Sequence, residues 1–315
     1  MWRCLEYWRA WMDKALRAQV RIILPDIGAF DPMPQTKHPT MPLSSLTLAR
    51  LPPRAADAHK GDFGHVLVVG GDLGTGGAVM LSSEAALRCG AGLISVATRP
   101  EHVGAGLARL PEVMWLGITS ANELMGPLAR ASVLVVGPGL GQASWGRSLL
   151  SAVSHVHVPQ VWDADALNLL AGAPLALPSG SILTPHPGEA ARLLGISTEA
   201  VQADRPGAAR KLARRHASVC VLKGAGTLVA DPAGQLALCG RGHPAMAGAG
   251  LGDVLTGVLA ALLAQGLDAW QAACLGVWLH ACAGERLGMK GRGLAASDLA
   301  PVIRALLEEH SACQV

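Results

Sequence analysis

Short apolar runs, many of them rich in β-branched residues, recur from about residue 64 onward and predict buried strands. These runs lie at 65–71, 93–98, 132–139, 159–165, 181–186 and 218–224. Strands that are apolar throughout are typical of a parallel sheet that helices cover on both faces. The pattern therefore favours an α/β architecture over a sheet with one solvated face.

Stretches rich in Ala and Leu separate most of the runs and predict helices, as at 78–90 and 189–195. Residues 227–240 break the alternation and predict a β-hairpin that turns near Asp231. Three further helices are predicted at about 252–266, 269–288 and 297–310. The fold class expected is α/β, with a mostly parallel central sheet between two helix layers.

Composition narrows the possible functions without selecting one. Hydrophobic residues make up 50% of the 315-residue chain and aromatic residues only 3%, which suits a core packed from Ala, Leu, Val and Gly. The net charge of +3 does not favour a nucleic-acid partner. Seven cysteines without a C-x-x-C pair favour a reducing compartment. No apolar run is long enough for a membrane span, so we expect a cytoplasmic protein without a membrane partner.

Acidic residues after two of the predicted strands are candidates for a Mg²⁺ site. Asp163 and Asp165 end one strand, and two such carboxylates can hold Mg²⁺ through water. Asp165 can instead cap a helix beginning at Ala166, which is the interpretation we favour, and Asp163 stays open. Glu189 opens another helix, where its charge suits the helix dipole and can equally face a metal.

Two further strand ends carry basic side chains. His186 lies between two prolines in "TPHPGE" (184–189), where contact with a ligand and a structural role are about equally favoured. Lys223 begins "KGAGT" (223–227), and a positive charge beside exposed glycine amides suits phosphate. The alternative for Lys223 is a hairpin turn with a solvated lysine.

The most informative stretch is "GAGLGD" (248–253), which leads directly into an apolar helix. Its glycines expose backbone amides, and the start of a helix stabilises an anion placed there. Asp253 beside such an anion hole can take a proton from a substrate hydroxyl while a phosphoryl group is attacked. The alternative is a plain helix-capping Asp, which would not need so many glycines.

The order of these motifs strongly resembles the ADP-dependent NAD(P)H-hydrate dehydratases, a repair-enzyme family of the ribokinase-like superfold. The motifs that carry the resemblance are "GGDLGTGGA", "GPGLG", "DADALN", "TPHPGEAARLLG", "VLKGAGT" and "GHPAMAGAGLGDVLTG". The resemblance implies a three-layer sandwich and dehydration of (6S)-NADHX or NADPHX. In that family ADP phosphorylates the ring hydroxyl, and phosphate elimination then gives NADH or NADPH, AMP and phosphate.

The resemblance also implies roles for single residues. Catalysis would rest on Asp253, Gly252 and Gly250. The hydrated dinucleotide would contact Ala78, Gly139, His186 and Asp253. ADP or AMP would bind Lys223, Gly224, Ala225, Gly226, Thr227 and Gly252. Mg²⁺ is the implied cofactor, with Asp163 and Glu189 as candidate ligands, and a homotetramer is the implied assembly.

Many members of that family carry an epimerase domain in front. Residues 1–40 are expected to form an N-terminal extension and linker, and 41–315 the dehydratase domain. About 50 residues before the matched region are too few for a complete α/β domain, so a separate NAD(P)HX epimerase is expected. Two rival functions stay open: an alcohol kinase of the same superfold, and a nucleotide-binding regulator without turnover.

Overall fold

A single mixed sheet organises the protein in the computed structural model, which describes residues 40–45, 47–173 and 175–314. The strands are β1 (Thr40–Pro42), β2 (His65–Val69), β3 (Leu93–Thr98), β4 (Met114–Gly117), β5 (Val133–Val136), β6 (Gln160–Trp162), β7 (Ile182–Leu183), β8 (Val219–Leu222), β9 (Thr227–Ala230) and β10 (Leu236–Cys239). Their order is β1-β10-β9-β8-β7-β6-β5-β2-β3-β4. Neighbours pair in parallel except at β9, which is antiparallel to both β8 and β10.

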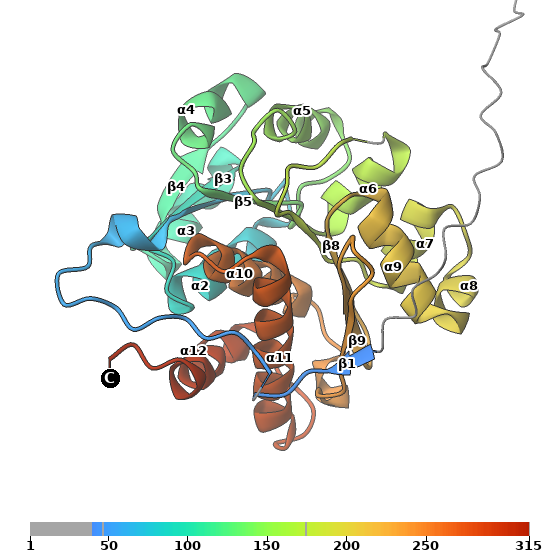
Figure 1. The fold of residues 1–315 in the computed structure, drawn as a ribbon. Helices are drawn as coiled ribbons and strands as arrows, with labels where there is room; N and C mark the ends of the chain where they lie inside the picture. The colour runs from blue at the N-terminus through green and yellow to red at the C-terminus, as the bar shows by residue number, and fades with distance from the viewer. Residues whose placement is uncertain (1–39, 46, 174, 315) are drawn as a thin grey trace, which may run out of the picture. The chain divides into compact units, whose positions relative to one another are not determined.

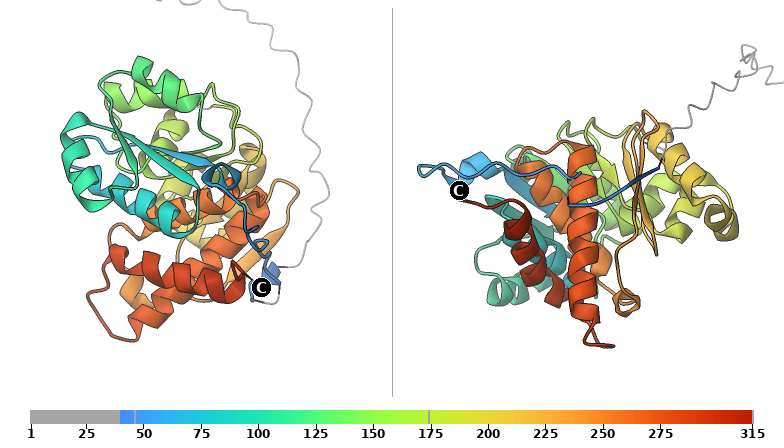
Figure 2. Two further views of the ribbon diagram at one scale, coloured as in Figure 1. Left: turned by 90° about the vertical axis from the view of Figure 1, so that its left-hand side faces the viewer. Right: turned by 60° about the horizontal axis from the view of Figure 1, so that its bottom comes forward.

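Helices cover both faces of this sheet (Figure 1). One layer contains α2 (Gly76–Arg88), α3 (Pro100–Arg109), α10 (Leu251–Ala264), α11 (Ala269–Gly288) and α12 (Leu299–His310). The other contains α4 (Met125–Leu128), α5 (Ser144–Val153), α6 (Ala164–Gly172), α7 (Pro187–Leu194), α8 (Thr198–Ala203) and α9 (Arg205–Arg215). Figure 2 shows the two layers on opposite sides of the strands. The expected three-layer α/β sandwich is confirmed.

Burial on both faces explains why the strands are apolar throughout. In β2, Val66 and Val68 point into the core under α2 and α10, while Leu67 and Val69 point into the core under α5 and α6. All four side chains are fully buried. Because no strand face meets solvent here, the alternation of apolar and polar residues that marks a half-exposed strand is missing.

The sequence-based elements match the structure at most positions. The predicted strands, the hairpin of β9 and β10 and the three closing helices are all present. Thr40–Pro42, where the expected N-terminal extension meets the expected dehydratase domain, form a strand that pairs with β10. The strand β4 was not predicted at all. Within the described ranges, no helix is both long and apolar enough to cross a bilayer.

The chain reverses its direction of travel across the sheet between β2 and β5. Strands β3 and β4 lie on one side of this point and β6, β7 and β8 on the other. The loops after β2 and β5 meet there, since the amides of Gly71 and Asp72 donate to the carbonyls of Pro138 and Gly139 at 3.0 and 2.6 Å. Such a reversal opens a crevice at the carboxyl ends of the strands, where open α/β sheets bind ligands.

Close contact between α2 and α10 depends on Gly257, which is buried in the middle of α10. A Cβ at Gly257 would overlap the carbonyl oxygen of Ser82 in α2 and lie 2.9 Å from the Cβ of Ala85. We predict that Gly257→Ala lowers the free energy of unfolding by about 1–3 kcal/mol, as overpacking of a core does. Urea denaturation measures the change.

Gly104 provides a matched control for this substitution. It lies in the exposed interior of α3, where an added Cβ meets no atom within 4 Å. Gly104→Ala is expected to raise stability by about 0.5–1 kcal/mol, since alanine loses less conformational freedom on folding. A Gly257→Ala protein as stable as the Gly104→Ala protein would contradict the close packing of the two helices.

Candidate functional site

A buried ion pair lies at the carboxyl edge of the sheet. The Nζ atom of Lys223, after β8, donates to Oδ1 of Asp163, after β6, at 2.6 Å. The Thr256 hydroxyl of α10 donates to Oδ2 of the same carboxylate at 3.0 Å. The side chain of Asp163 is only 3% exposed, and that of Lys223 is 20% exposed. The alternative of a solvated lysine is therefore wrong, and two strands and α10 are joined at one point.

The two charges hold each other in the ionised state. Burial alone would raise the pKa of Asp163, but the ammonium of Lys223 and its hydrogen bond hold that pKa below the ordinary value. Burial alone would lower the pKa of Lys223, yet Asp163 and Glu189 raise it. Lys223 therefore stays positive, while Asp163 stays negative although it is almost fully covered.

Asp253 lies next to this pair in the first turn of α10. The N-cap position belongs to Gly250, and no hydrogen-bond donor in the described ranges reaches the Asp253 carboxylate. Burial, followed by the negative charge of Asp163, raises the pKa of Asp253 to about 7, although Lys223 acts in the opposite direction. A plain capping role is thus not seen, and the carboxylate is poised to exchange a proton near neutral pH.

The start of α10 presents several unpaired amides. Gly250 adopts a φ of +84°, which turns the chain into the helix, and the Val254 amide is the first to bind back, to the Gly250 carbonyl. The three amides before it, of residues 251–253, donate to no acceptor among the described residues. They point out of the helix end, where its dipole favours an anion. His280 fixes this turn by donating from Nε2 to the Leu251 carbonyl at 2.9 Å.

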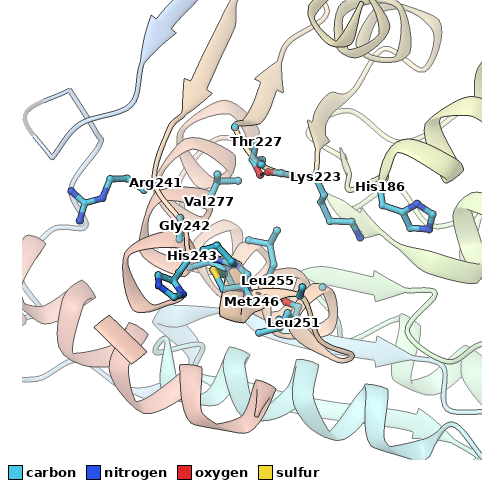
Figure 3. A pocket seen from close by; sticks show the side chains of 18 of the residues that line it. His186, Lys223, Thr227, Arg241, Gly242, His243, Met246, Leu251, Leu255 and Val277 are labelled. Carbon is cyan, nitrogen blue, oxygen red and sulfur yellow. Dashed lines mark hydrogen bonds between the residues drawn. The ribbon is translucent and has the colours of Figure 1, made fainter. Parts of the chain in front are cut away.

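A cavity of about 790 Å³ opens beside the ion pair and collects most of the predicted nucleotide residues. His186, Gly252 and the whole segment 223–227 line it. Figure 3 shows Lys223 and His186 at one end of the cavity. An added Cβ on Gly252 would lie 3.3 Å from Lys223 Nζ, so the ammonium sits directly against the start of α10. The cavity therefore has a cationic end rich in amides.

The opposite end of the cavity is more apolar, and sequence reasoning missed it. Its walls include Met246, Leu255 and Val277, with His243 beside them (Figure 3). Arg241 lies at this end and forms an ion pair with Glu285 of α11. His243 and Met246 lie in the motif "GHPAMAGAGLGDVLTG" (242–257), which also contains Asp253. Leu255 and Val277 sit in helices whose apolar pattern is that of any core helix.

His186 serves both as a helix cap and as part of the cavity wall. Its Nδ1 atom accepts from the amides of Gly188 and Glu189 at 3.0 and 3.4 Å, which caps α7. Its Nε2 atom faces Glu189 Oε1 at 3.3 Å. Burial and then the charge of Lys223 lower the pKa of His186, so a neutral imidazole is favoured. The structural and ligand-facing interpretations are therefore compatible.

The predicted dinucleotide residues Ala78 and Gly139 lie outside this cavity but at the same edge of the sheet. The Gly139 carbonyl accepts from the Thr75 hydroxyl at 2.8 Å, and the Ala78 amide binds the Thr75 carbonyl. The α2 helix that carries Ala78 also touches the site, because Ser82 Oγ donates to the Asp253 carbonyl at 2.9 Å. Both residues thus lie at the edge of the sheet where the strand order reverses.

The predicted cap at Asp165 is wrong. Helix α6 begins at Ala164, two residues earlier than expected, and places Asp163 at the N-cap position. The Asp165 carboxylate instead accepts from the Gly141 amide at 2.9 Å and from Gln142 Nε2 at 3.1 Å. Asp165 therefore anchors the glycine loop after β5, and it is Asp163 that faces the site.

The two metal candidates do not form a cage. No group of three or more His, Cys, Asp or Glu side chains in the described ranges has the arrangement of a metal site. Both oxygens of Asp163 accept hydrogen bonds from the protein, one from Lys223 and one from Thr256. Glu189 lies 4.0 Å from Lys223 Nζ, and its oxygens also have protein partners: Oε2 accepts from the His186 amide at 2.8 Å, and Oε1 lies 3.3 Å from His186 Nε2. The pKa of Glu189 is raised to about 7, chiefly by burial.

Comparison with known sequences gives a consistent result. A family model described as NAD(P)H-hydrate dehydratase matches residues 66–304. The bifunctional NAD(P)H-hydrate repair enzyme Nnr of Coxiella burnetii (strain RSA 493 / Nine Mile phase I) is 54% identical over 181 residues. These residues make up 58% of this chain but 37% of that enzyme, so the chain matches little more than a third of this relative's length.

Two solved structures share the fold. A ribokinase-like superfamily protein from Enterococcus faecalis V583 has a TM-score of 0.80 at 28% identity, covering 86% of this chain and 96% of that one. The ADP/ATP-dependent NAD(P)H-hydrate dehydratase of Bacillus subtilis, co-crystallized with ATP/Mg²⁺, has a TM-score of 0.76 at 28% identity, covering 86% and 99%. The sandwich is therefore ribokinase-like, as the sequence motifs imply.

The charge of Asp163 is expected to set the proton affinity of Asp253. In an Asp163→Asn protein the pKa of Asp253 should fall well below about 7, because a negative neighbour is lost and Lys223 becomes free to face it. The free energy of unfolding should fall by about 3–5 kcal/mol, the usual result of breaking a buried pair. Carbon-13 NMR titration of the aspartate carboxyls and urea denaturation measure the two effects.

Thr256→Val is the control for this prediction, because it removes one hydrogen bond to Asp163 but leaves the charge. It should leave the pKa of Asp253 near the value in the unaltered protein. An Asp253 pKa that is the same in both variants would contradict the assignment of Asp163 as the group that raises it.

Proposed function

Because this chain belongs to the NAD(P)H-hydrate dehydratase family, we propose that it dehydrates the S epimer of hydrated NADH or NADPH at the expense of ADP. The products are NADH or NADPH, AMP and phosphate. The observation that carries the proposal is the position of Asp253, whose carboxylate accepts from no donor in the described part of the chain and lies beside the free amides of α10. The family match and the ADP/ATP-dependent Bacillus subtilis relative support ADP as the phosphoryl donor.

The proposed chemistry begins with proton transfer to Asp253. Hydroxide is a poor leaving group, so the ring hydroxyl is first converted to a phosphate ester. The Asp253 carboxylate takes the hydroxyl proton while the oxygen attacks the terminal phosphorus of ADP, and the bond to AMP breaks. Loss of phosphate and a ring proton then restores the dihydronicotinamide. A pKa of about 7 suits Asp253 to accept a proton near neutral pH.

Backbone amides and one ammonium would hold the phosphates of ADP. The amides of residues 251–253 would stabilise the charge that builds on the transferred phosphoryl group. Lys223, fixed by Asp163, supplies a positive charge at the adjoining end of the cavity. The more apolar end around Met246, Leu255 and Val277 would take the nucleoside. The edge of the sheet where Ala78 and Gly139 lie would take the hydrated dinucleotide.

Mg²⁺ is proposed to enter with the nucleotide, because the described residues form no metal cage. Bound there, it would offset the phosphate charge, with Glu189 as a protein ligand. The Bacillus subtilis relative co-crystallized with ATP/Mg²⁺ supports this part of the proposal. We further propose a cytoplasmic homotetramer, with residues 41–315 as the dehydratase domain and a separate epimerase acting in the same pathway.

The test is to mix the purified protein with hydrated NADH, containing both epimers, and Mg²⁺. Restoration of the dihydronicotinamide ring is followed by its near-ultraviolet absorbance. An ADP-dependent rise that stops near half conversion is the expected result, since only the S epimer reacts. Conversion of both epimers would contradict the need for a separate epimerase. No rise with either ADP or ATP would refute the dehydratase and leave the alcohol kinase or the silent nucleotide binder.

Asp253→Asn separates the catalytic from the binding role of the loop. Turnover should fall by a factor of about 10²–10⁴, the usual contribution of a general base. The dissociation constant of ADP, measured by calorimetry, should change little because the amides of α10 remain. Turnover close to that of the unaltered protein would place the base elsewhere.

The same variant has a stability readout that does not depend on activity. Asp253 has a pKa of about 7 in the folded protein, above its value in the unfolded chain. Its ionisation therefore costs stability as the pH rises above the unfolded pKa, and the cost is complete above the folded pKa. The melting temperature of Asp253→Asn minus that of the unaltered protein should therefore be larger at about pH 8 than at about pH 4. Equal melting differences at both pH values would contradict the raised pKa.

A further inference from the structure

The segment 222–227 between β8 and β9 has an unusual division of hydrogen bonds. Four of its carbonyls accept hydrogen bonds from side chains: those of Leu222, Lys223 and Gly226 from Arg205, which does not line the cavity, and that of Gly224 from the Thr227 hydroxyl. In contrast, the amides of residues 224–226 donate to no acceptor among the described residues. All three residues line the cavity. The segment therefore has bound carbonyls on the side of Arg205 and free amides in residues that line the cavity.

Arg205 is the residue that gathers the acceptors. Its Nη2 atom donates to the Leu222, Lys223 and Gly226 carbonyls at 3.3, 3.3 and 3.1 Å. Its Nη1 atom donates to Gln202 Oε1 at 3.2 Å. The guanidinium is half-buried behind the loop, on the side away from the cavity, and is not among the cavity-lining residues. No sequence motif singled it out.

The position of Arg205 is itself fixed. It is the first residue of α9, whose N-cap Asp204 accepts from the Gly207 amide at 2.8 Å, and Pro206 follows it. The guanidinium also packs tightly against the loop. A Cβ added to Gly224, which has a φ of +134°, would lie 3.0 Å from Arg205 Nη1. The glycine is thus needed both for its backbone angle and for the approach of Arg205.

We propose that Arg205 is a positioning residue that orients the 224–226 amides toward the phosphates of the nucleotide. By binding the carbonyls from behind, it turns the peptide planes so that successive N–H groups form a concave anion site beside Lys223. Its charge also offsets the carbonyl dipoles that would otherwise repel a phosphate. Arg205 touches neither substrate, so it acts only through the loop. This inference rests on the proposed ADP site.

Binding of ADP to a set of variants tests the proposal. Arg205→Met should raise the dissociation constant of ADP, measured by calorimetry, by about tenfold or more, because charge-assisted hydrogen bonds to the loop are lost. The KM for ADP should rise by a similar factor while kcat changes much less. Arg205→Lys should recover part of the affinity, since an ammonium can bind some of the carbonyls but lacks the planar fork.

Arg215 supplies the matched control, because its Nη1 atom donates to the Leu193 carbonyl at 2.6 Å, away from the cavity. Arg215→Met removes a similar contact and should leave the dissociation constant of ADP within about twofold of the unaltered value. Amide hydrogen exchange of the 222–227 segment gives a second readout, which needs no ligand. Exchange there should be faster in Arg205→Met than in Arg215→Met.

Several outcomes would overturn the proposal. A folded Arg205→Met protein that binds ADP as tightly as the unaltered protein would do so. Weaker ADP binding without faster amide exchange of the 222–227 segment would show that Arg205 acts through its charge alone. Full recovery of the ADP affinity in Arg205→Lys would show the same. If Arg205→Met does not fold, the comparison rests on Arg205→Lys. If the unaltered protein binds no ADP, the proposed function fails, and loop exchange alone decides whether Arg205 orders the segment.

Discussion

The buried pair of Lys223 and Asp163 is the constraint on which the rest of the site depends. The free energy needed to remove two charges from water can exceed the free energy gained from their attraction, so such a buried pair adds little to stability by itself. Here it fixes an ammonium at the wall of a cavity and, through Thr256, ties the ends of β6 and β8 to the start of α10. It also places a negative charge near Asp253, which adds to burial in raising the pKa of that carboxyl.

Fully buried side-chain nitrogens and oxygens of the described residues are paired, except for His216 Nε2. Around the cavity, in contrast, several polar groups lack a hydrogen-bond partner. The amides at the start of α10, the amides of 224–226 and the Asp253 carboxylate all lack partners among the described residues. Unpaired donors and a partly buried acid cost folding free energy, which a stable core of apolar strands can offset. Because residues 224–226, Leu251 and Gly252 line one cavity and Asp253 follows directly in the chain, the cost is best explained by a ligand that pairs with these groups.

The sequence predicted the fold well because its strands carry an unambiguous signal. A run such as 65–69, apolar on both faces, has few alternatives once glycine loops and Ala-rich helices flank it. Single positions were harder to predict. The helix after β6 begins two residues early, so that Asp163 and not Asp165 occupies the N-cap position. The apolar end of the cavity was hidden, since Val277 follows the same pattern as core residues, and Arg205 has no signal beyond its charge.

The antiparallel direction of β9 explains why the segments that carry Lys223 and Asp253 lie close together. Since β9 runs against its neighbours, the turn before it lies at the carboxyl end of β8, while β10 returns the chain to that same edge. The turn between β8 and β9 carries Lys223 to this edge. The segment after β10 runs through residues 240–248 into α10, which carries Asp253. An all-parallel sheet would need a crossover helix between these strands, which would separate the two segments. The antiparallel strand therefore places the cavity and Asp253 at the edge of the sheet where the loops after β2 and β5 also lie, an arrangement that suits the proposed transfer between two bound substrates.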